Sequence, residues 1–218
     1  MSHREAVLSR IGEALGREAP VLHVDAMPDA VAQRLSSPRR HTLPAIGDDT
    51  LGRLIEQMEG VLMSVVRLQS RQDVPEAVRF WLGAEGVEGP ITVAPALADI
   101  DFPGDWRRGA ANGLETTSVT PCVAAVAETG SLAFASAAGT PATLNFLPEN
   151  HVVVLHEGQV VRHLDDVFPL MRALSPLPRA INFVTGPSRT ADIEQTLEIG
   201  AHGPRRMHVL LLPGEAPA

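Results

Sequence analysis

Three polar turns in the second half of the chain carry side chains that can do chemistry. The first, Ala127-Glu-Thr-Gly-Ser131, combines a carboxylate with two hydroxyls and a glycine. Glu128 can act as a general base or nucleophile if its surroundings raise its pKa, and Thr129, Gly130 and Ser131 can hold a substrate hydroxyl. The competing interpretation is an ordinary turn, in which Glu128 is solvated or pairs with an arginine.

The second turn follows a predicted strand at 181–184 and leads into a predicted helix. Backbone N–H groups and the dipole at the start of a helix attract anions, and Arg189 adds a positive charge. The sequence therefore predicts a ligand or anion site here. It comprises Gly186, Pro187, Ser188, Thr190 and Asp192. The alternative is that the two hydroxyls only cap the helix, and Asp192 favours it because this acid already complements the dipole.

The third turn, Gly200-Ala-His-Gly-Pro204, places His202 in a loop as a candidate proton carrier or metal ligand. Its position argues against a site shared with Ser188. If the last strand runs parallel to the 181–184 strand, the helix between them separates the two residues by roughly 15 Å.

No metal site is predicted. His151 and His156 flank the predicted strand at 152–155 and, at a period of two, point to opposite faces; the chain also has no H-E-x-x-H or C-x-x-C motif. The one cysteine, Cys122, lies just inside a helix predicted to start at Thr120-Pro121. Such a cysteine is either a small buried filler or a thiol with a lowered pKa.

Composition excludes several classes of function. The chain has 218 residues, and all 18 basic residues are arginine, which excludes a Schiff-base lysine and a P-loop lysine. A net charge of −8 argues against nucleic acid as a partner. The uncharged run at 129–148 is too polar to span a membrane, and no signal peptide is evident. We expect a soluble, cytoplasmic protein without membrane insertion.

Apolar runs alternating with helical periods predict an α/β fold with a mostly parallel sheet. Residues 1–60 are predicted as a helical N-terminal extension, and residues 61–218 as the α/β domain. Strands are expected at 61–66, 91–94, 131–135, 152–155, 181–184 and 207–212, and helices of the α/β domain at 74–82, 164–174 and 190–199.

Taken together, the order and spacing of the three turns resemble the lactate-utilization protein C family, the LUD-domain proteins. The resemblance implies a three-layer α/β/α fold of the ribose-isomerase and CoA-transferase type. It also implies a part in oxidising L-lactate to pyruvate beside two partner proteins that carry iron–sulfur clusters. With one cysteine this chain cannot hold such clusters itself, so we expect no cofactor on this chain and the clusters in the partner subunits.

Three functions stay open at this point. The first is a non-redox subunit of a lactate-oxidising complex. The second is a stand-alone enzyme on a CoA-transferase-like fold, which uses Glu128 and binds an acyl-CoA or sugar phosphate. The third is a regulatory or scaffolding module. A small carboxylate or phosphate is the expected ligand class, and a homo-oligomer is compatible with each function.

Overall fold

The computed structural model describes residues 3–14, 29–36, 42–190 and 198–216. The chain divides into two compact units, residues 1–43 and 44–218. The first contains helices α1 (His3–Ala14) and α2 (Asp29–Ser36). The second contains all the strands described below. Among the described residues, no helix combines the length and the apolar character needed to cross a membrane.

Six strands form the main sheet of the second unit, and each neighbouring pair runs parallel. Their order across the sheet is β1-β12-β7-β4-β2-β3. The strands are β1 (Met63–Arg67), β2 (Ile91–Val93), β3 (Arg107–Arg108), β4 (Thr117–Pro121), β7 (Asn150–His156) and β12 (Arg206–Leu212). The central strands β7 and β12 are continuous apolar runs because both of their faces are covered, and residues 152–155 and 209–212 are buried.

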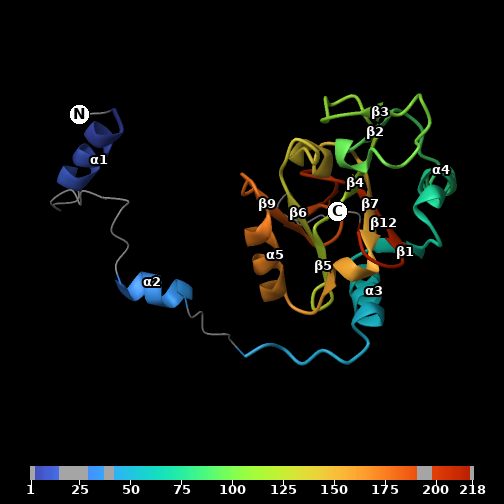
Figure 1. Ribbon diagram of the computed structural model, residues 1–218. Helices are drawn as coiled ribbons and strands as arrows, with labels where there is room; N and C mark the ends of the chain where they lie inside the picture. The colour runs from blue at the N-terminus through green and yellow to red at the C-terminus, as the bar shows by residue number, and fades with distance from the viewer. Residues whose placement is uncertain (1–2, 15–28, 37–41, 191–197, 217–218) are drawn as a thin grey trace. The chain divides into compact units, whose positions relative to one another are not determined.

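Helices cover the two faces of this sheet (Figure 1). On one face, α4 (Val74–Ala84) buries Val74, Val78 and Trp81 against the sheet. On the other face, α3 (Thr50–Gly60) buries Leu54 and Met58. The predicted α/β class with a mostly parallel sheet is thereby confirmed. The predicted domain boundary at residue 60 stays a prediction, although α3 packs with the unit that begins at residue 44.

A second sheet packs beside α3 and has the order β8-β5-β6-β9. Its strands are β5 (Ala124–Val126), β6 (Ser131–Ala135), β8 (Val160–Val161) and β9 (Ile181–Val184), and α5 (Val167–Ala173) covers its outer face. The 181–184 strand is thus confirmed, but it runs antiparallel to β6 and is not part of the main sheet. The expectation that it lies parallel to the last strand is wrong.

Short 3-10 turns connect several of these elements. They are η1 (Arg71–Asp73), η2 (Pro95–Leu97), η3 (Ala142–Asn145), η4 (Glu157–Gln159) and η5 (Leu164–Asp166). Three of them, η1, η2 and η4, follow the main-sheet strands β1, β2 and β7 and so help to shape the carboxyl edge of the sheet.

One predicted helix is replaced by a strand, and most of a second lies outside the described residues. The helix expected from Thr120 is instead the end of β4, where Thr120 faces a polar partner on β7: its hydroxyl lies 2.7 Å from Nε2 of His151. The helix expected over 190–199 is bounded by β10 (Arg189–Thr190) and β11 (Glu198–Ile199), which pair antiparallel. Residues 191–197, between these strands, lie outside the described residues.

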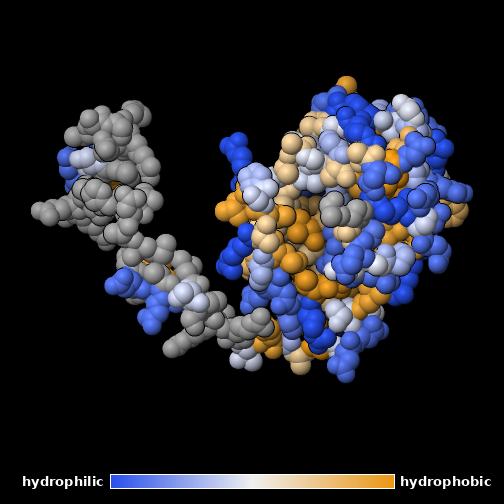
Figure 2. Space-filling view, viewed as in Figure 1, coloured by the Kyte–Doolittle hydropathy of each residue, from blue (hydrophilic) through white to orange (hydrophobic). Residues whose placement is uncertain are grey.

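Figure 2 shows apolar residues gathered on the side of the second unit where Figure 1 places α5 and β9. These elements and the segment between them expose Phe168, Leu170, Leu177 and Ile181. A hollow of about 770 Å³ beside them is lined mainly by residues 135–140 and 174–179.

Candidate functional site

The first motif turn, residues 128–131, connects β5 to β6 and packs against the end of α3. Gly130 has a φ of +70°, and a Cβ at this position would lie 2.8 Å from the backbone carbon of Gln57. Only glycine therefore permits this close approach. The turn closes with a hydrogen bond of 2.8 Å from the N–H of Gly130 to the carbonyl of Val126.

The carboxylate of this turn has a partner. Oε2 of Glu128 lies 3.1 Å from Nδ1 of His163, with both side chains mostly shielded from solvent. The backbone N–H of Glu128 also donates to the carbonyl of Arg162. Glu128 is therefore paired and not freely solvated, and its partner is a histidine where an arginine was considered. Its catalytic role stays a prediction.

Ser131 connects the first motif turn to the second. Its hydroxyl lies 2.7 Å from the hydroxyl of Thr129 and 2.7 Å from that of Thr185. Thr185 precedes Gly186 and was absent from the predicted set. The three hydroxyls satisfy one another in a row, so two turns that are 54 residues apart in the sequence meet in space.

The second and third motif turns also meet. The N–H of His202 donates to the hydroxyl oxygen of Ser188 at 3.3 Å, and the N–H of Ser188 donates to the carbonyl of Pro204. The predicted separation of Ser188 from His202 is therefore wrong. The reason is the pairing of β10 with β11, which folds the chain back on itself.

Tight packing fixes the second turn as well. Gly186 has a φ of +89°, and a Cβ there would lie 2.5 Å from the carbonyl oxygen of Val61. Pro187 follows it, and Thr190 pairs with Glu198 in the short hairpin. Ser188 accepts a hydrogen bond from the N–H of His202 and directly precedes β10, while the residues it was expected to cap lie outside the described residues. Asp192, the remaining predicted residue, lies outside the described residues, and the predicted role in anion binding stays a prediction.

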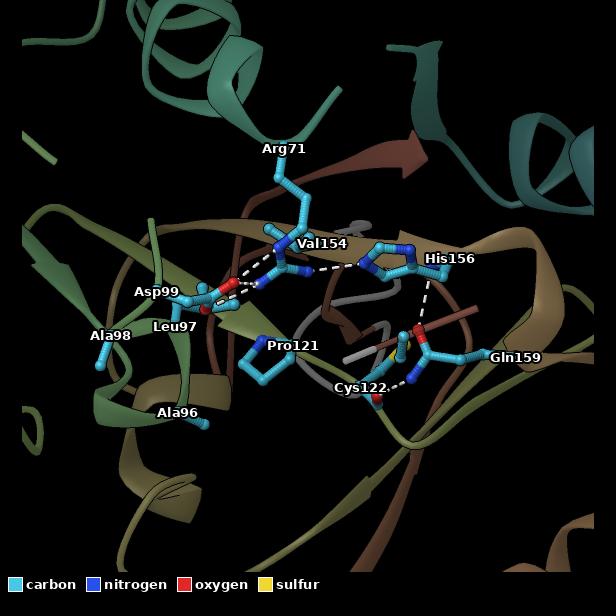
Figure 3. Close-up of a pocket in the computed structure, with 11 residues that line it drawn as sticks. Arg71, Ala96, Leu97, Ala98, Asp99, Pro121, Cys122, Val154, His156 and Gln159 are labelled. Carbon is cyan, nitrogen blue, oxygen red and sulfur yellow. Dashed lines mark hydrogen bonds and ion pairs between the residues drawn. The ribbon is translucent and has the colours of Figure 1, made fainter. Parts of the chain in front are cut away.

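A separate pocket lies at the carboxyl edge of the main sheet (Figure 3). We call it the carboxyl-edge pocket; its volume is about 380 Å³. Its lining comes from the segments after β1, β2, β4 and β7, which is where ligands bind in open parallel sheets. The lining residues are Arg71, Ala96, Leu97, Ala98, Asp99, Pro121, Cys122, Val154, His156, Gln159 and Ala216.

Arg71 is the main charged group of this pocket. Its Nε and Nη2 atoms donate to the two carboxylate oxygens of Asp99 at 2.8 and 2.9 Å, and Nη1 lies 2.6 Å from Nε2 of His156. The guanidinium is thereby fixed in one orientation, with its side chain 20% exposed. A forked pair of this kind is among the stronger polar contacts in proteins.

His156 accepts a hydrogen bond from Arg71 and is neutral near pH 7. Burial, and then the charge of Arg71, lower the pKa of its imidazole. Gln159 holds the backbone around it: its side-chain oxygen accepts from the N–H of His156, and its Nε2 donates to the carbonyl of Cys122. His156 therefore orients Arg71 and adds no positive charge to the pocket.

Cys122 lines the pocket but is not a reactive thiol. The residue is buried, and burial raises the pKa of its thiol to about 12. The thiolate is the nucleophilic form of cysteine, so this side chain acts as a small buried filler. The alternative of a lowered pKa is wrong, because Cys122 follows a strand and does not begin a helix.

Sequence reasoning missed the charged residues of this pocket. Arg71, Asp99 and His156 come from three distant segments, and no short motif contains two of them. The usable signal was position in the chain, because Arg71, Asp99 and His156 each follow a predicted strand. Among the described residues, no group of three His, Cys, Asp or Glu side chains is placed to hold a metal ion.

Comparison with known proteins gives a consistent result. Residues 116–212 match the LUD domain family. The chain is 26% identical over 241 residues to lactate utilization protein C of Exiguobacterium sp., covering 97% of this chain and 96% of the relative. It is also 26% identical over 247 residues to lactate utilization protein C of Bacillus pumilus, covering 99% and 98%.

A solved structure shares the fold. The crystal structure of a DUF162 family protein from Deinococcus radiodurans superposes with a TM-score of 0.55 at 20% identity, covering 78% of this chain and 100% of that one. The matched segment and the relatives aligned from end to end agree, and they show that this chain is similar to the LUD-domain proteins.

Proposed function

We propose that this protein acts in lactate utilization as a non-redox subunit that binds a small carboxylate, L-lactate or pyruvate, in the carboxyl-edge pocket. Iron–sulfur partner proteins would then accept the two electrons released when lactate becomes pyruvate, and the two protons would pass to solvent. The observation that carries the ligand assignment is the guanidinium of Arg71, which is held inside a pocket of about 380 Å³. The names of the relatives point to lactate as the carboxylate.

The hydrogen bonds of Arg71 leave room for a ligand. A guanidinium has five N–H donors, and Asp99 and His156 engage three of them. The two remaining donors can bind one carboxylate. His156 is neutral, so the single negative charge of Asp99 balances the positive charge of Arg71. A second anion would therefore be held by the directions of the two free N–H donors more than by net charge.

The walls of the pocket suit a short 2-hydroxy or 2-keto acid. Ala96, Leu97 and Val154 supply apolar surface on which a methyl group can pack. Pockets of this kind, apolar with a few fixed polar groups, are typical of small-molecule sites. The volume exceeds that of lactate, which leaves space for water or for a group from a partner protein.

Calorimetric titration with L-lactate, pyruvate and the neutral amide lactamide tests the ligand. We expect both acids to bind and lactamide to bind at least tenfold more weakly, since it lacks the charge that Arg71 recognises. Arg71→Gln should weaken binding of the acids about tenfold or more, because it removes a charge-assisted contact. Equal affinity in the wild type and in Arg71→Gln would exclude this pocket.

Arg53→Gln is the matched control. Arg53 forms a surface ion pair with Glu56 on α3, away from the pocket lining. The Arg53→Gln variant removes the same charge as Arg71→Gln but outside the pocket, so lactate affinity should stay at the wild-type value. A loss in both variants would mean that net charge, and not a site at Arg71, drives binding.

The role as a subunit has its own test. An affinity-tagged chain expressed in its native host should co-purify with proteins that show the visible absorbance of iron–sulfur clusters. The purified chain alone should turn over lactate at no measurable rate. Turnover by the chain alone would contradict the role as a non-redox subunit and favour the stand-alone enzyme.

A further inference from the structure

A second pocket lies at the opposite, amino edge of the main sheet. Its volume is about 310 Å³, and we call it the amino-edge pocket. Ser64 and Arg206 are among the first residues of β1 and β12, so the pocket opens where these parallel strands begin. The lining of the carboxyl-edge pocket shares no residue with it.

Three arginines converge on this pocket from two segments of the chain. Arg189 comes from β10, Arg206 begins β12, and Arg205 directly precedes it. Among the described residues that line it, Glu85 is the one carboxylate, and it pairs with Arg206 at 3.2 Å. The described lining therefore carries an excess of positive charge in a chain whose net charge is −8.

Neighbouring groups hold these arginines in place. Nη2 of Arg189 donates to the carbonyl of Val61 at 3.0 Å. The side chain of Arg205 lies so close to Gly200 that a Cβ at Gly200 would collide with it. Glycine at position 200 thus lets Arg205 extend along the third motif turn, which gives this glycine a role in shaping the pocket.

A hydroxyl group lies at the same pocket. Ser64 is exposed, and its Oγ lies 2.8 Å from Nδ1 of His208. His208 is buried and stacks on Trp81 with the two rings nearly parallel. Burial lowers the pKa of His208 to about 4, so the imidazole is neutral at pH 7 and orients the Ser64 hydroxyl without adding charge.

Among the described residues, the pocket also has exposed apolar side chains. Leu62 is 59% exposed and has a φ of +68°, a backbone conformation that is costly for a leucine. Such strain persists where surrounding structure enforces it and is common at ligand sites. Ile199 adds a second exposed apolar side chain. A ligand here would gain from an apolar or aromatic body beside its charge.

From this geometry we propose that the amino-edge pocket binds a phosphate monoester with an apolar or aromatic body. Guanidinium groups match the oxygens of a phosphate with paired hydrogen bonds, and several arginines suit a dianion better than a monocarboxylate. Arg205 and Arg189 would hold the phosphate, and Leu62 would contact the body. With Nδ1–H of His208 donating to the Ser64 oxygen, the hydroxyl proton of Ser64 would be left to donate to the phosphate. This proposal is independent of the one made for the carboxyl-edge pocket.

Phenyl phosphate is the probe, titrated by calorimetry into the full chain beside inorganic phosphate and benzoate. We expect phenyl phosphate to bind more tightly than either, because it alone offers both a dianion and a ring. Arg205→Gln should weaken it about tenfold, as loss of one charge-assisted contact does. Ser64→Ala should weaken it by a smaller factor. Both side chains are exposed, so circular dichroism should show the wild-type fold in each variant.

Two variants decide the location. Arg53→Gln, which removes a surface charge elsewhere, should bind phenyl phosphate as the wild type does. Arg71→Gln should also keep this affinity, since Arg71 lines the other pocket. The proposal is overturned if Arg205→Gln keeps wild-type affinity, if Arg71→Gln loses as much as Arg205→Gln, or if the wild type binds phenyl phosphate no better than benzoate.

Discussion

The motif turns (residues 128–131, 185–188 and 200–204) and the carboxyl-edge pocket differ in what their polar groups do. In the motif turns, hydroxyls and backbone groups satisfy one another, and glycines let segments pack closely. In the pocket, Arg71 is fixed by two side chains and keeps donors to spare. The recognisable strings of this sequence thus build packing, whereas the group best suited to hold a ligand comes from residues scattered along the chain.

This contrast leads to opposite expectations for substitutions. Changes in the motif turns should lower the free energy of unfolding and leave the affinity for L-lactate intact. Changes at Arg71 should weaken lactate binding and have less effect on the free energy of unfolding. Four predictions follow this division from the largest effect to the smallest.

Acid should destabilise the protein strongly through histidines outside both regions. Burial lowers the pKa of His151 to about 3 and that of His208 to about 4. The unfolded chain binds these protons near pH 6.5 and the folded chain does not, so stability is full above that pH and is lost as the pH falls towards 4. Each histidine should contribute about 1.4 kcal/mol per pH unit, as measured by urea unfolding.

The variants His151→Gln and His208→Asn locate this effect. Each should reduce the dependence of the unfolding free energy on pH between pH 6.5 and pH 4. An unchanged slope in both would show that other groups take up the protons, and the buried histidines would then play no part in acid unfolding.

Gly186→Ala should lower the free energy of unfolding by about 3 kcal/mol. Its φ of +89° is unfavourable for alanine, and the new Cβ would press on the carbonyl of Val61. Gly83→Ala on α4 is the control, because a Cβ there meets nothing within 4 Å and should stabilise the helix by up to about 1 kcal/mol. The lactate affinity of folded Gly186→Ala should match that of the wild type. A loss of affinity would show that the motif turns contribute to ligand binding as well as to packing.

Ser188→Ala should cost about 1 kcal/mol, since it removes the acceptor for the N–H of His202. Thermal unfolding of the variant and the wild type measures this loss. Titration with L-lactate and phenyl phosphate completes the comparison. A variant with unchanged stability but weaker binding would place Ser188 in a ligand site, as the sequence predicts.

Glu128→Gln should have the smallest effect, less than about 1 kcal/mol, because a glutamine oxygen can still accept from His163. We expect lactate affinity, and the activity of the complex proposed above, to stay within about twofold of the wild type, a free-energy change well below 1 kcal/mol. A large loss of activity would instead support the role of Glu128 as a base or nucleophile.

Most of the core elements were predictable because their apolar residues form either continuous runs or helical repeats in the sequence. The strands at 152–155 and 207–212 are buried on both faces and therefore appear as continuous apolar runs. The end of β4 was not predictable in this way. Thr120 and Pro121 are typical of a helix start, and they form a strand because His151 on β7 offers the threonine a polar partner.

Local sequence determined the class of the fold, the positions of the turns that require glycine and the family resemblance, since each depends on short stretches of chain. Tertiary structure decided the rest. It placed β9 in a second sheet, brought His202 beside Ser188, and assembled Arg71, Asp99 and His156 at one edge of the main sheet. These outcomes depend on which strands pair across long separations, and local propensity carries no information about that choice.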